Sequence, residues 1–159
     1  MSDTKTKTTA NPLSAQDLDA VIAIDKAASG TSRRGYFEKR LKAATDNPRD
    51  YVFVGIFDGG DLAGFAFAQM SKGEFGKADS SASLDAIGVK KNRALKGVGQ
   101  QLLDEVERIL RHKGVGRVTS QVDWDQWNVL SFLAHEGFGL APSVILTRDT
   151  SEMPHVLEE

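Results

Sequence analysis

The chain contains no cysteine, which removes disulfide bonds, thiolate catalysis and cysteine-ligated zinc sites together. This absence is compatible with a reducing cytoplasm, where we expect the protein to reside. Only three histidines are present, and none has carboxylates at ligand spacing nearby, so no metal site is predicted. No apolar run approaches the roughly 20 residues of a membrane span. The first eleven residues lack the apolar core of a secretory signal, and we expect no membrane partner.

An excess of charge of either sign is also missing. The chain has 20 basic and 22 acidic residues, for a net charge of -2. Without a broad basic field, binding to nucleic acid is not expected. A length of 159 residues and a hydrophobic content of 40% suit one globular domain with its own core.

Hydrophobic periodicity and turn residues predict an alternation of strands and helices. The predicted strands span residues 7–13, 51–57, 62–70, 82–89 and 117–122, with a final pair at 138–140 and 144–148. The predicted helices span residues 14–29, 34–44, 99–113 and 126–135. The order β-α-α-β-β-β-α-β-α-β indicates an α/β domain with a mixed, mostly antiparallel sheet flanked by helices. We expect a disordered tail at 1–6, one domain at 7–149 and a polar tail at 150–159.

The segment 84–103 carries the strongest functional signal. An apolar strand ends at Val89, a polar loop follows, and Gly97 and Gly99 open a long amphipathic helix. Glycines permit a tight turn and close approach of a ligand. The free N–H groups and the dipole at a helix N-terminus favour a phosphate or pyrophosphate. Neither the dinucleotide fingerprint G-x-G-x-x-G nor the P-loop pattern is present.

This arrangement resembles the acetyl-CoA loop of the GNAT (GCN5-related) N-acetyltransferase superfamily, whose pattern is [Gln/Arg]-x-x-Gly-x-[Gly/Ala]. Residues 94–99 match both glycines, whereas Ala94 replaces the first residue and Arg93 lies one place earlier. The segment 128–138 is similar to a second family signature, a helix followed by Gly-Phe. There Leu133 stands at the usual tyrosine, and Gln126, with Asn128 close by, stands at the usual asparagine.

The resemblance implies a GNAT-like fold, acetyl-CoA as cosubstrate, and transfer of an acetyl group to a primary amine. The pantetheine arm is expected in a gap between strands 82–89 and 117–122, and the pyrophosphate on the helix N-terminus. The cofactor-binding residues expected on this basis are Ile87, Val89, Ala94, Leu95, Lys96, Gly97, Val98, Gly99, Gln100 and Asn128.

Asp85 is the predicted catalytic base, because an acid inside an apolar strand is unusual and an ammonium must lose its proton before it attacks. By period-two alternation we expect Asp85 and Val89 on one face of the sheet. A solvated Asp85 is the competing interpretation, and Asp123 and Glu74 are weaker candidates. With Leu133 in place of tyrosine, either the thiolate leaves without a protein acid, or His135 or Tyr36 supplies the proton.

The identity of the acceptor stays open between a small-molecule amine and an amine of a protein. Arg33 and Arg34 either grip an acidic acceptor or the cofactor phosphates, or are simply solvated. Trp124 and Trp127 either wall the pocket or serve as core or interface anchors, and a homodimer is left open. Two other functions compete with acetyl transfer: a GNAT-fold module that binds acyl-CoA without catalysis, and a small phosphate-binding domain that shares only the loop.

Overall fold

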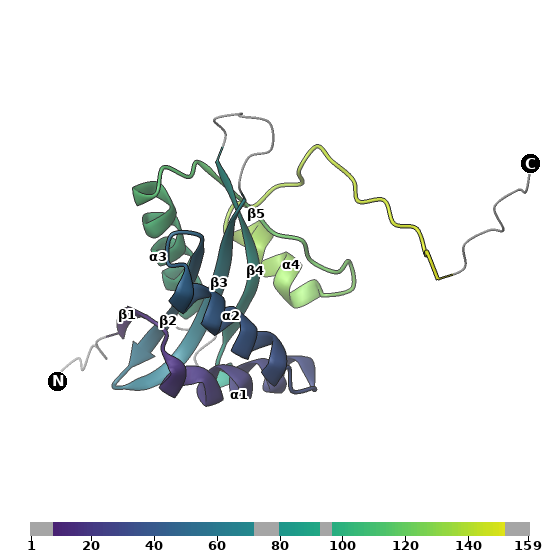
Figure 1. Ribbon diagram of the computed structural model, residues 1–159. Coiled ribbons are helices and arrows are strands. Elements are labelled where there is room, and N and C mark those ends of the chain that lie inside the picture. The colour runs from purple at the N-terminus through teal and green to yellow at the C-terminus, as the bar shows by residue number, and fades with distance from the viewer. Residues whose placement is uncertain (1–7, 72–79, 93–96, 152–159) are drawn as a thin grey trace, which may run out of the picture.

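The computed structural model describes residues 8–71, 80–92 and 97–151. Within these ranges, strands and helices alternate in one α/β domain (Figure 1). The strands are β1 (Thr8–Pro12), β2 (Tyr51–Asp58), β3 (Asp61–Ser71), β4 (Ser81–Val89) and β5 (Arg117–Thr119). The helices are η1 (Ala15–Asp17), α1 (Leu18–Ser29), α2 (Arg34–Asp46), α3 (Val98–His112) and α4 (Trp127–His135).

The sheet has the strand order β1-β2-β3-β4-β5. Its first three pairings are antiparallel, and only β4 and β5 run parallel. β2 and β3 are joined by a tight hairpin in which Gly59 and Gly60 have φ angles of 60° and 91°, the conformation that two-residue hairpins prefer. The predicted fold class, a mixed and mostly antiparallel sheet, is therefore confirmed.

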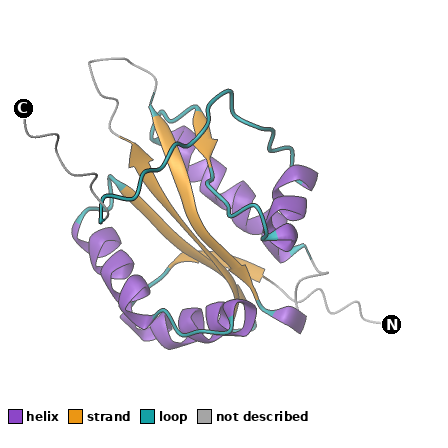
Figure 2. Ribbon diagram, turned by 90° about the vertical axis from the view of Figure 1, so that its right-hand side faces the viewer, coloured by secondary structure: helices purple, strands orange, loops and turns teal. Residues whose placement is uncertain are grey.

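Helices cover both faces of the sheet (Figure 2). On one face, α3 buries Val98, Leu102 and Val106 against β2, β3 and β4, together with Leu133 of α4. On the other face, α1 and α2 pack over an aromatic cluster made mainly of Phe37, Phe53, Phe65 and Phe67. Because apolar residues of the central strands point alternately to the two faces, each face has its own core.

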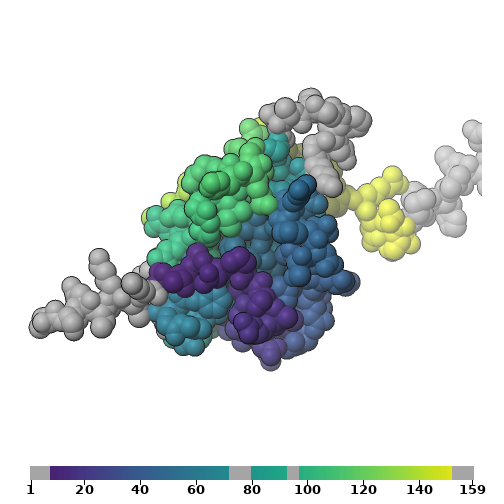
Figure 3. Space-filling model, turned by 60° about the vertical axis from the view of Figure 1, so that its left-hand side comes forward, coloured from purple at the N-terminus to yellow at the C-terminus, as the bar shows by residue number. Residues whose placement is uncertain are grey.

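β1 closes the far edge of the sheet beside α3 (Figure 3). The side-chain amide of Gln101 donates a hydrogen bond of 3.1 Å to the hydroxyl of Thr8 across this boundary. Pro12 lacks an N–H donor and is tolerated in β1 because this strand has a neighbour on one side only. Among the described residues, no helix combines the length and apolar character that crossing a membrane requires.

The predicted end of the sheet is wrong. Neither Phe138–Leu140 nor Val144–Arg148 forms a strand, and β5 ends at Thr119 rather than at Val122. Residues 139–151 are all exposed and lead away from the body (Figure 1). A strand needs a paired neighbour to satisfy its backbone groups. This segment has no such neighbour in residues 8–71, 80–92 and 97–151, although its sequence has strand character.

Candidate active site

The parallel strands β4 and β5, at one edge of the sheet, separate partway along β4. Ser83 pairs with Thr119, and this is the last pairing between β4 and β5, whereas β4 continues to Val89. The hydroxyl of Ser120 donates a hydrogen bond of 2.9 Å to the carbonyl of Leu84 and closes the narrow end of the opening. Beyond this point, the edge of β4 that faces β5 has no paired strand in the described structure. The gap that the family resemblance predicts between these strands has this geometry.

The free edge of β4 presents the backbone groups of Ile87 and Val89. The N–H of Lys90 donates to the carbonyl of Ala63, so the backbone of Lys90 points toward β3. Successive residues in a strand point their backbone groups to opposite sides. Gly88 therefore also bonds toward β3, while Ile87 and Val89 direct their N–H and C=O groups into the opening. These groups are available to pair with an extended ligand that lies along the strand.

A β-bulge interrupts β4 at Asp85. Phe67 pairs with Ala86 and Ala68 with Leu84, so Asp85 has no partner on β3. The expectation that Asp85 and Val89 share a face rested on strict alternation, and the bulge breaks this alternation. Leu84 and Ala86, which a regular strand would place on one face, belong to the cores on opposite faces. Bulges occur often beside active sites, where they redirect a side chain.

The bulge exposes the carboxylate of Asp85 in a cavity of about 610 Å³, a size that suits small-molecule ligands. The hydroxyl of Ser83 donates a short hydrogen bond to this carboxylate. Three groups of residues line the cavity: Asp25, Ala28, Ser29 and Arg33 around α1; Leu84 to Ile87 on β4; and Ser120 to Val122 with Asp125 to Val129 after β5.

A partly buried ion pair forms one wall of the cavity. Asp25 of α1 is 7% exposed, and Arg33 binds both of its oxygens, at 2.6 and 2.9 Å. The hydrogen bond with Asp25 raises the pKa of Arg33, so the guanidinium keeps its charge. The same guanidinium lies 5.0 Å from the ring centre of Tyr36. Of the roles left open for Arg33, that of a simply solvated side chain does not apply, because both of its hydrogen bonds with described residues go to Asp25.

We expect Arg33→Ala to lower the free energy of unfolding by about 1–2 kcal/mol, since it leaves a buried carboxylate without its partner. This range is reduced because the Arg33 side chain is half-exposed. Arg34→Ala is the matched control. Arg34 pairs with Asp19 at 2.9 Å on the surface, and its loss should cost less than about 1 kcal/mol. Urea denaturation measures both variants, and equal losses would contradict a structural role for the Asp25–Arg33 pair.

The glycines before and within α3 have different environments. Gly97 caps the helix with a φ of 76° and has open space where a Cβ would be. Gly99 is buried, and a Cβ there would lie 2.8 Å from the ring of Phe132. Gly99 therefore permits close packing of α3 against α4, whereas Gly97 provides the open turn. Residues 94–96 of the predicted loop, Arg93 and Glu74 lie outside the described residues.

Residues of α4 contribute unequally. Asn128 lines the cavity, whereas Leu133 is 5% exposed in the core and cannot donate a proton. Tyr36 and His135, the two residues considered as replacements for the missing tyrosine acid, do not line the cavity. Tyr36 is held between the guanidinium groups of Arg33 and Arg40.

Sequence reasoning missed Asp25, Ser120 and Asp125 as cavity residues. Asp25 faces the core side of an amphipathic helix, a position where an acid is unusual, and this was the available signal. Nothing in the local sequence marks Ser120 or Asp125, because only the parallel placement of β5 beside β4 brings them to the cavity.

Solved structures with this fold are acetyltransferases in several cases. Aminoglycoside N-acetyltransferase AAC(6')-Iy in complex with CoA is 19% identical to this chain, with a TM-score of 0.72. The superposition covers 94% of this chain and 99% of the acetyltransferase. An aminoglycoside acetyltransferase from an uncultured soil metagenomic sample is 16% identical, with a TM-score of 0.71 and coverages of 90% and 95%. Glucosamine-6-phosphate N-acetyltransferase from Arabidopsis thaliana is 13% identical, with a TM-score of 0.71 and coverages of 91% and 99%.

At these identities the likeness shows the fold alone, and no curated protein sequence matches the chain. The family model described as the acetyltransferase (GNAT) family matches residues 19–138, from the start of α1 to the end of the packed body. This range includes both strands of the opening, the helix that follows Gly97, and every residue that lines the cavity. The chain belongs to the acetyltransferase (GNAT) family.

Proposed function

We propose that the protein transfers the acetyl group of acetyl-CoA to a primary amine. One observation carries this proposal: the exposed carboxylate of Asp85 stands in a cavity at the point where β4 and β5 separate. A ligand along the free edge of β4 and a second ligand in the cavity would meet beside this carboxylate. The family membership and the structurally similar acetyltransferases support the same reaction.

Acetyl-CoA would supply an acetyl group activated as a thioester. The outward backbone groups of Ile87 and Val89 would hold the pantetheine arm, as an added strand is held. The first N–H groups of α3, from Gly97 to Gln100, would bind the pyrophosphate, because they have no partner within the helix and the helix dipole favours an anion there. The open space around Gly97 fits a bulky phosphate at this turn.

Asp85 would accept a proton from the ammonium form of the acceptor. The neutral nitrogen attacks the thioester carbonyl carbon and a C–N bond forms. The nitrogen then loses its second proton to solvent, the C–S bond breaks, and CoA leaves as its thiolate. An N–H donor near the carbonyl oxygen stabilises the charge that develops there. The N–H of Ile87, directed into the opening, is the candidate donor.

The charge of the cavity favours a cationic acceptor. Asp25, Asp85 and Asp125 contribute three carboxylates, and among the described residues that line the cavity Arg33 alone is basic. The contact of Arg33 with Asp25 balances one of these charges, so the cavity retains negative charge from the other two. An acceptor with one or more ammonium groups is therefore attracted, whether a small molecule or a protein side chain carries them. We expect turnover with such acceptors to fall as ionic strength rises.

No side-chain acid is expected to protonate the leaving thiolate. Leu133 is buried and aliphatic, and the part of the chain that the structure describes brings no tyrosine, histidine or lysine to the cavity lining. We therefore expect Tyr36→Phe and His135→Gln each to change turnover less than twofold, on the order of 0.4 kcal/mol or below. A steady-state assay measures both variants. A large loss of turnover with intact cofactor binding in either variant would show that the acid was relocated.

The decisive experiment combines calorimetry with a thiol-release assay. Titration with acetyl-CoA, CoA and ATP tests for the cofactor, and binding of ATP alone would favour a nucleotide-binding domain. A panel of amines with acetyl-CoA then tests for release of free CoA, with no background from protein thiols because the chain lacks cysteine. Binding of acetyl-CoA without thiol release from any amine would favour the non-catalytic acyl-CoA-binding module.

A further inference from the structure

One nitrogen of the Arg33 guanidinium has no hydrogen-bond partner among the described residues. The Nε and Nη2 atoms donate to the two carboxylate oxygens of Asp25, at 2.9 and 2.6 Å. The remaining nitrogen, Nη1, makes no hydrogen bond within residues 8–71, 80–92 and 97–151. A guanidinium presents its N–H donors in a rigid planar fork, so the donors on Nη1 are free to bind a ligand.

The guanidinium of Arg33 is held in place on the wall of the cavity. Its central carbon lies 5.0 Å from the ring centre of Tyr36 and 5.4 Å from that of Phe37, which is completely buried. Asp25 occupies the edge that carries Nε and Nη2. The opposite edge carries Nη1, and the side chain is 45% exposed and lines the cavity. A donor that is already fixed loses little conformational entropy when it binds a ligand.

The contact with Asp25 decides which kind of ligand group Nη1 can bind. Arg33 and Asp25 together carry no net charge, whereas the other two carboxylates of the cavity, Asp85 and Asp125, are negative. A carboxylate or phosphate on the acceptor would be repelled by them, with no unbalanced positive charge to compensate. The oxygen of a hydroxyl or a carbonyl group accepts the same hydrogen bonds without this repulsion.

We infer that Arg33 selects acceptors whose primary amine is accompanied by an uncharged oxygen, and that Nη1 donates to this oxygen. The inference rests on the proposed function, because it adds a second contact for the acceptor whose ammonium group meets Asp85. Asp85 lies on β4 and Arg33 at the N-cap of α2, so the two contacts orient the acceptor across the cavity. An alkylamine of the same size makes only the first contact and leaves Nη1 without an oxygen partner.

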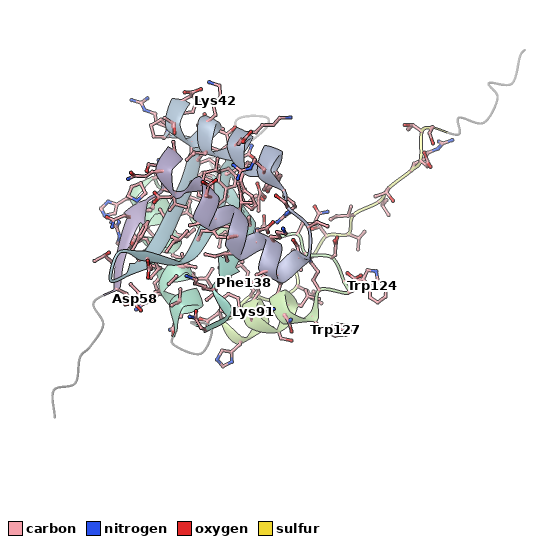
Figure 4. All side chains as sticks on the ribbon, turned by 90° about the horizontal axis from the view of Figure 1, so that it is seen from below. Lys42, Asp58, Lys91, Trp124, Trp127 and Phe138 are labelled. Carbon is pink, nitrogen blue, oxygen red and sulfur yellow. The ribbon has the colours of Figure 1, made fainter. Side chains whose placement is uncertain are left out.

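Side-chain amides on the opposite wall of the cavity are the competing donors. Gln121 follows β5, and Gln126 and Asn128 lie at the start of α4, beside Trp127 (Figure 4). An amide both donates and accepts hydrogen bonds, whereas a guanidinium only donates. A test of the inference must therefore change Arg33 and leave these amides in place.

Pairs of amines that differ in one group measure the selectivity. In each pair a terminal hydroxyl replaces a terminal methyl, as in ethanolamine and propylamine, and longer pairs are built in the same way. In at least one pair kcat/KM should be about tenfold higher for the hydroxylated amine, the scale of a hydrogen bond from a charged and half-exposed donor. Amino acids that carry a carboxylate in place of the hydroxyl should be poorer acceptors than the hydroxylated amines.

Arg33→Lys tests the assignment to this side chain. The lysine ammonium can still pair with Asp25 but has no second nitrogen, so the preference should fall to about twofold or less. Arg34→Lys is the matched control, because Arg34 pairs with Asp19 on the surface and does not line the cavity. It should keep the preference of the parent. A loss of stability lowers turnover of both amines alike and leaves their ratio unchanged, and urea denaturation checks that both variants fold.

A binding measurement needs neither a variant nor acetyl transfer. In the parent chain with CoA present, nuclear magnetic resonance titration should give lower dissociation constants for the hydroxylated amines, by about the same factor. The hydroxylated amines should also shift the guanidinium N–H signals of Arg33 in protein with isotope-labelled arginine. A chain that binds amines with this preference and acetylates none of them contradicts only the proposed function.

Three results would overturn the inference. The first is equal dissociation constants within every pair of amines, or no binding of any amine. The second is a preference for the hydroxylated amine that Arg33→Lys leaves intact, which would assign the contact to an amide on the opposite wall. The third is a preference for the amino acids, which would make Arg33 a site for an anion instead of an uncharged oxygen.

Discussion

Gly97→Glu is expected to abolish binding of acetyl-CoA while leaving the fold intact. Gly97 is exposed and caps α3 with a φ of 76°, and nothing lies within 4 Å of a Cβ at this position. The substitution is therefore sterically tolerated apart from a backbone cost of about 1–2 kcal/mol. Its carboxylate would stand at the N-terminus of α3, where the proposed pyrophosphate binds, and would repel that group.

The matched control is Gly114→Glu at the other end of the same helix. Gly114 has a φ of 77° and the same open surroundings, so this variant has the same charge and the same backbone strain. It should bind acetyl-CoA as the parent does. Isothermal titration calorimetry measures the affinity, and circular dichroism checks the helix content. If Gly97→Glu binds acetyl-CoA with parental affinity, the cofactor site lies elsewhere.

Asp85→Asn is expected to lower kcat by about 10²-fold or more at neutral pH, the usual contribution of a positioned base. Asparagine keeps the size of the side chain and still accepts a hydrogen bond from Ser83, so the bulge and the cavity should persist. The dissociation constant of acetyl-CoA should change little, because the proposed contacts with the cofactor are backbone groups of other residues. Pre-steady-state and steady-state kinetics with the best acceptor measure the effect.

Variants of two other carboxylates distinguish a loss of the catalytic base from a loss of negative charge. Asp125→Asn removes a charge from the same cavity and should raise KM for a cationic acceptor without a comparable loss of kcat. Asp123 is exposed and does not line the cavity, so Asp123→Asn should leave both constants near the parental values. Equal loss of turnover and of cofactor affinity in Asp85→Asn would make Asp85 a structural residue. Unchanged turnover would remove it from the mechanism.

Local patterns in the sequence were sufficient to predict most elements. The apolar runs at 51–57 and 62–70 predicted β2 and β3, the pair Gly59–Gly60 predicted their hairpin, and the apolar stripe of residues 102–110 predicted α3. These signals are short-range, since they depend on the spacing of neighbouring residues and on the backbone freedom of glycine. The turn at Gly97 belongs to the same class of feature, and the structure has it where the sequence predicts it.

The arrangement around Asp85 depended on contacts that are distant in sequence. A bulge is the result of a one-residue mismatch between β3 and β4, and neither strand alone shows it. The prediction that Asp85 and Val89 share a face assumed regular alternation, and one extra residue reverses which face each later side chain occupies. The pairing of Asp25 with Arg33 likewise depends on how the turn after α1 folds back over the helix.

The sequence by itself determined the order of elements as far as α4, the sheet flanked by helices and the turn before α3, because each follows from residue type and spacing along the chain. Only the tertiary structure decided where β4 and β5 separate, which carboxylates meet in one cavity, and that the segment 144–148 pairs with no strand of the described structure. Strand pairing satisfies backbone groups between segments that are far apart, so its outcome depends on the whole fold. For this reason a segment with the composition of a strand remains unpaired until a sheet edge is supplied.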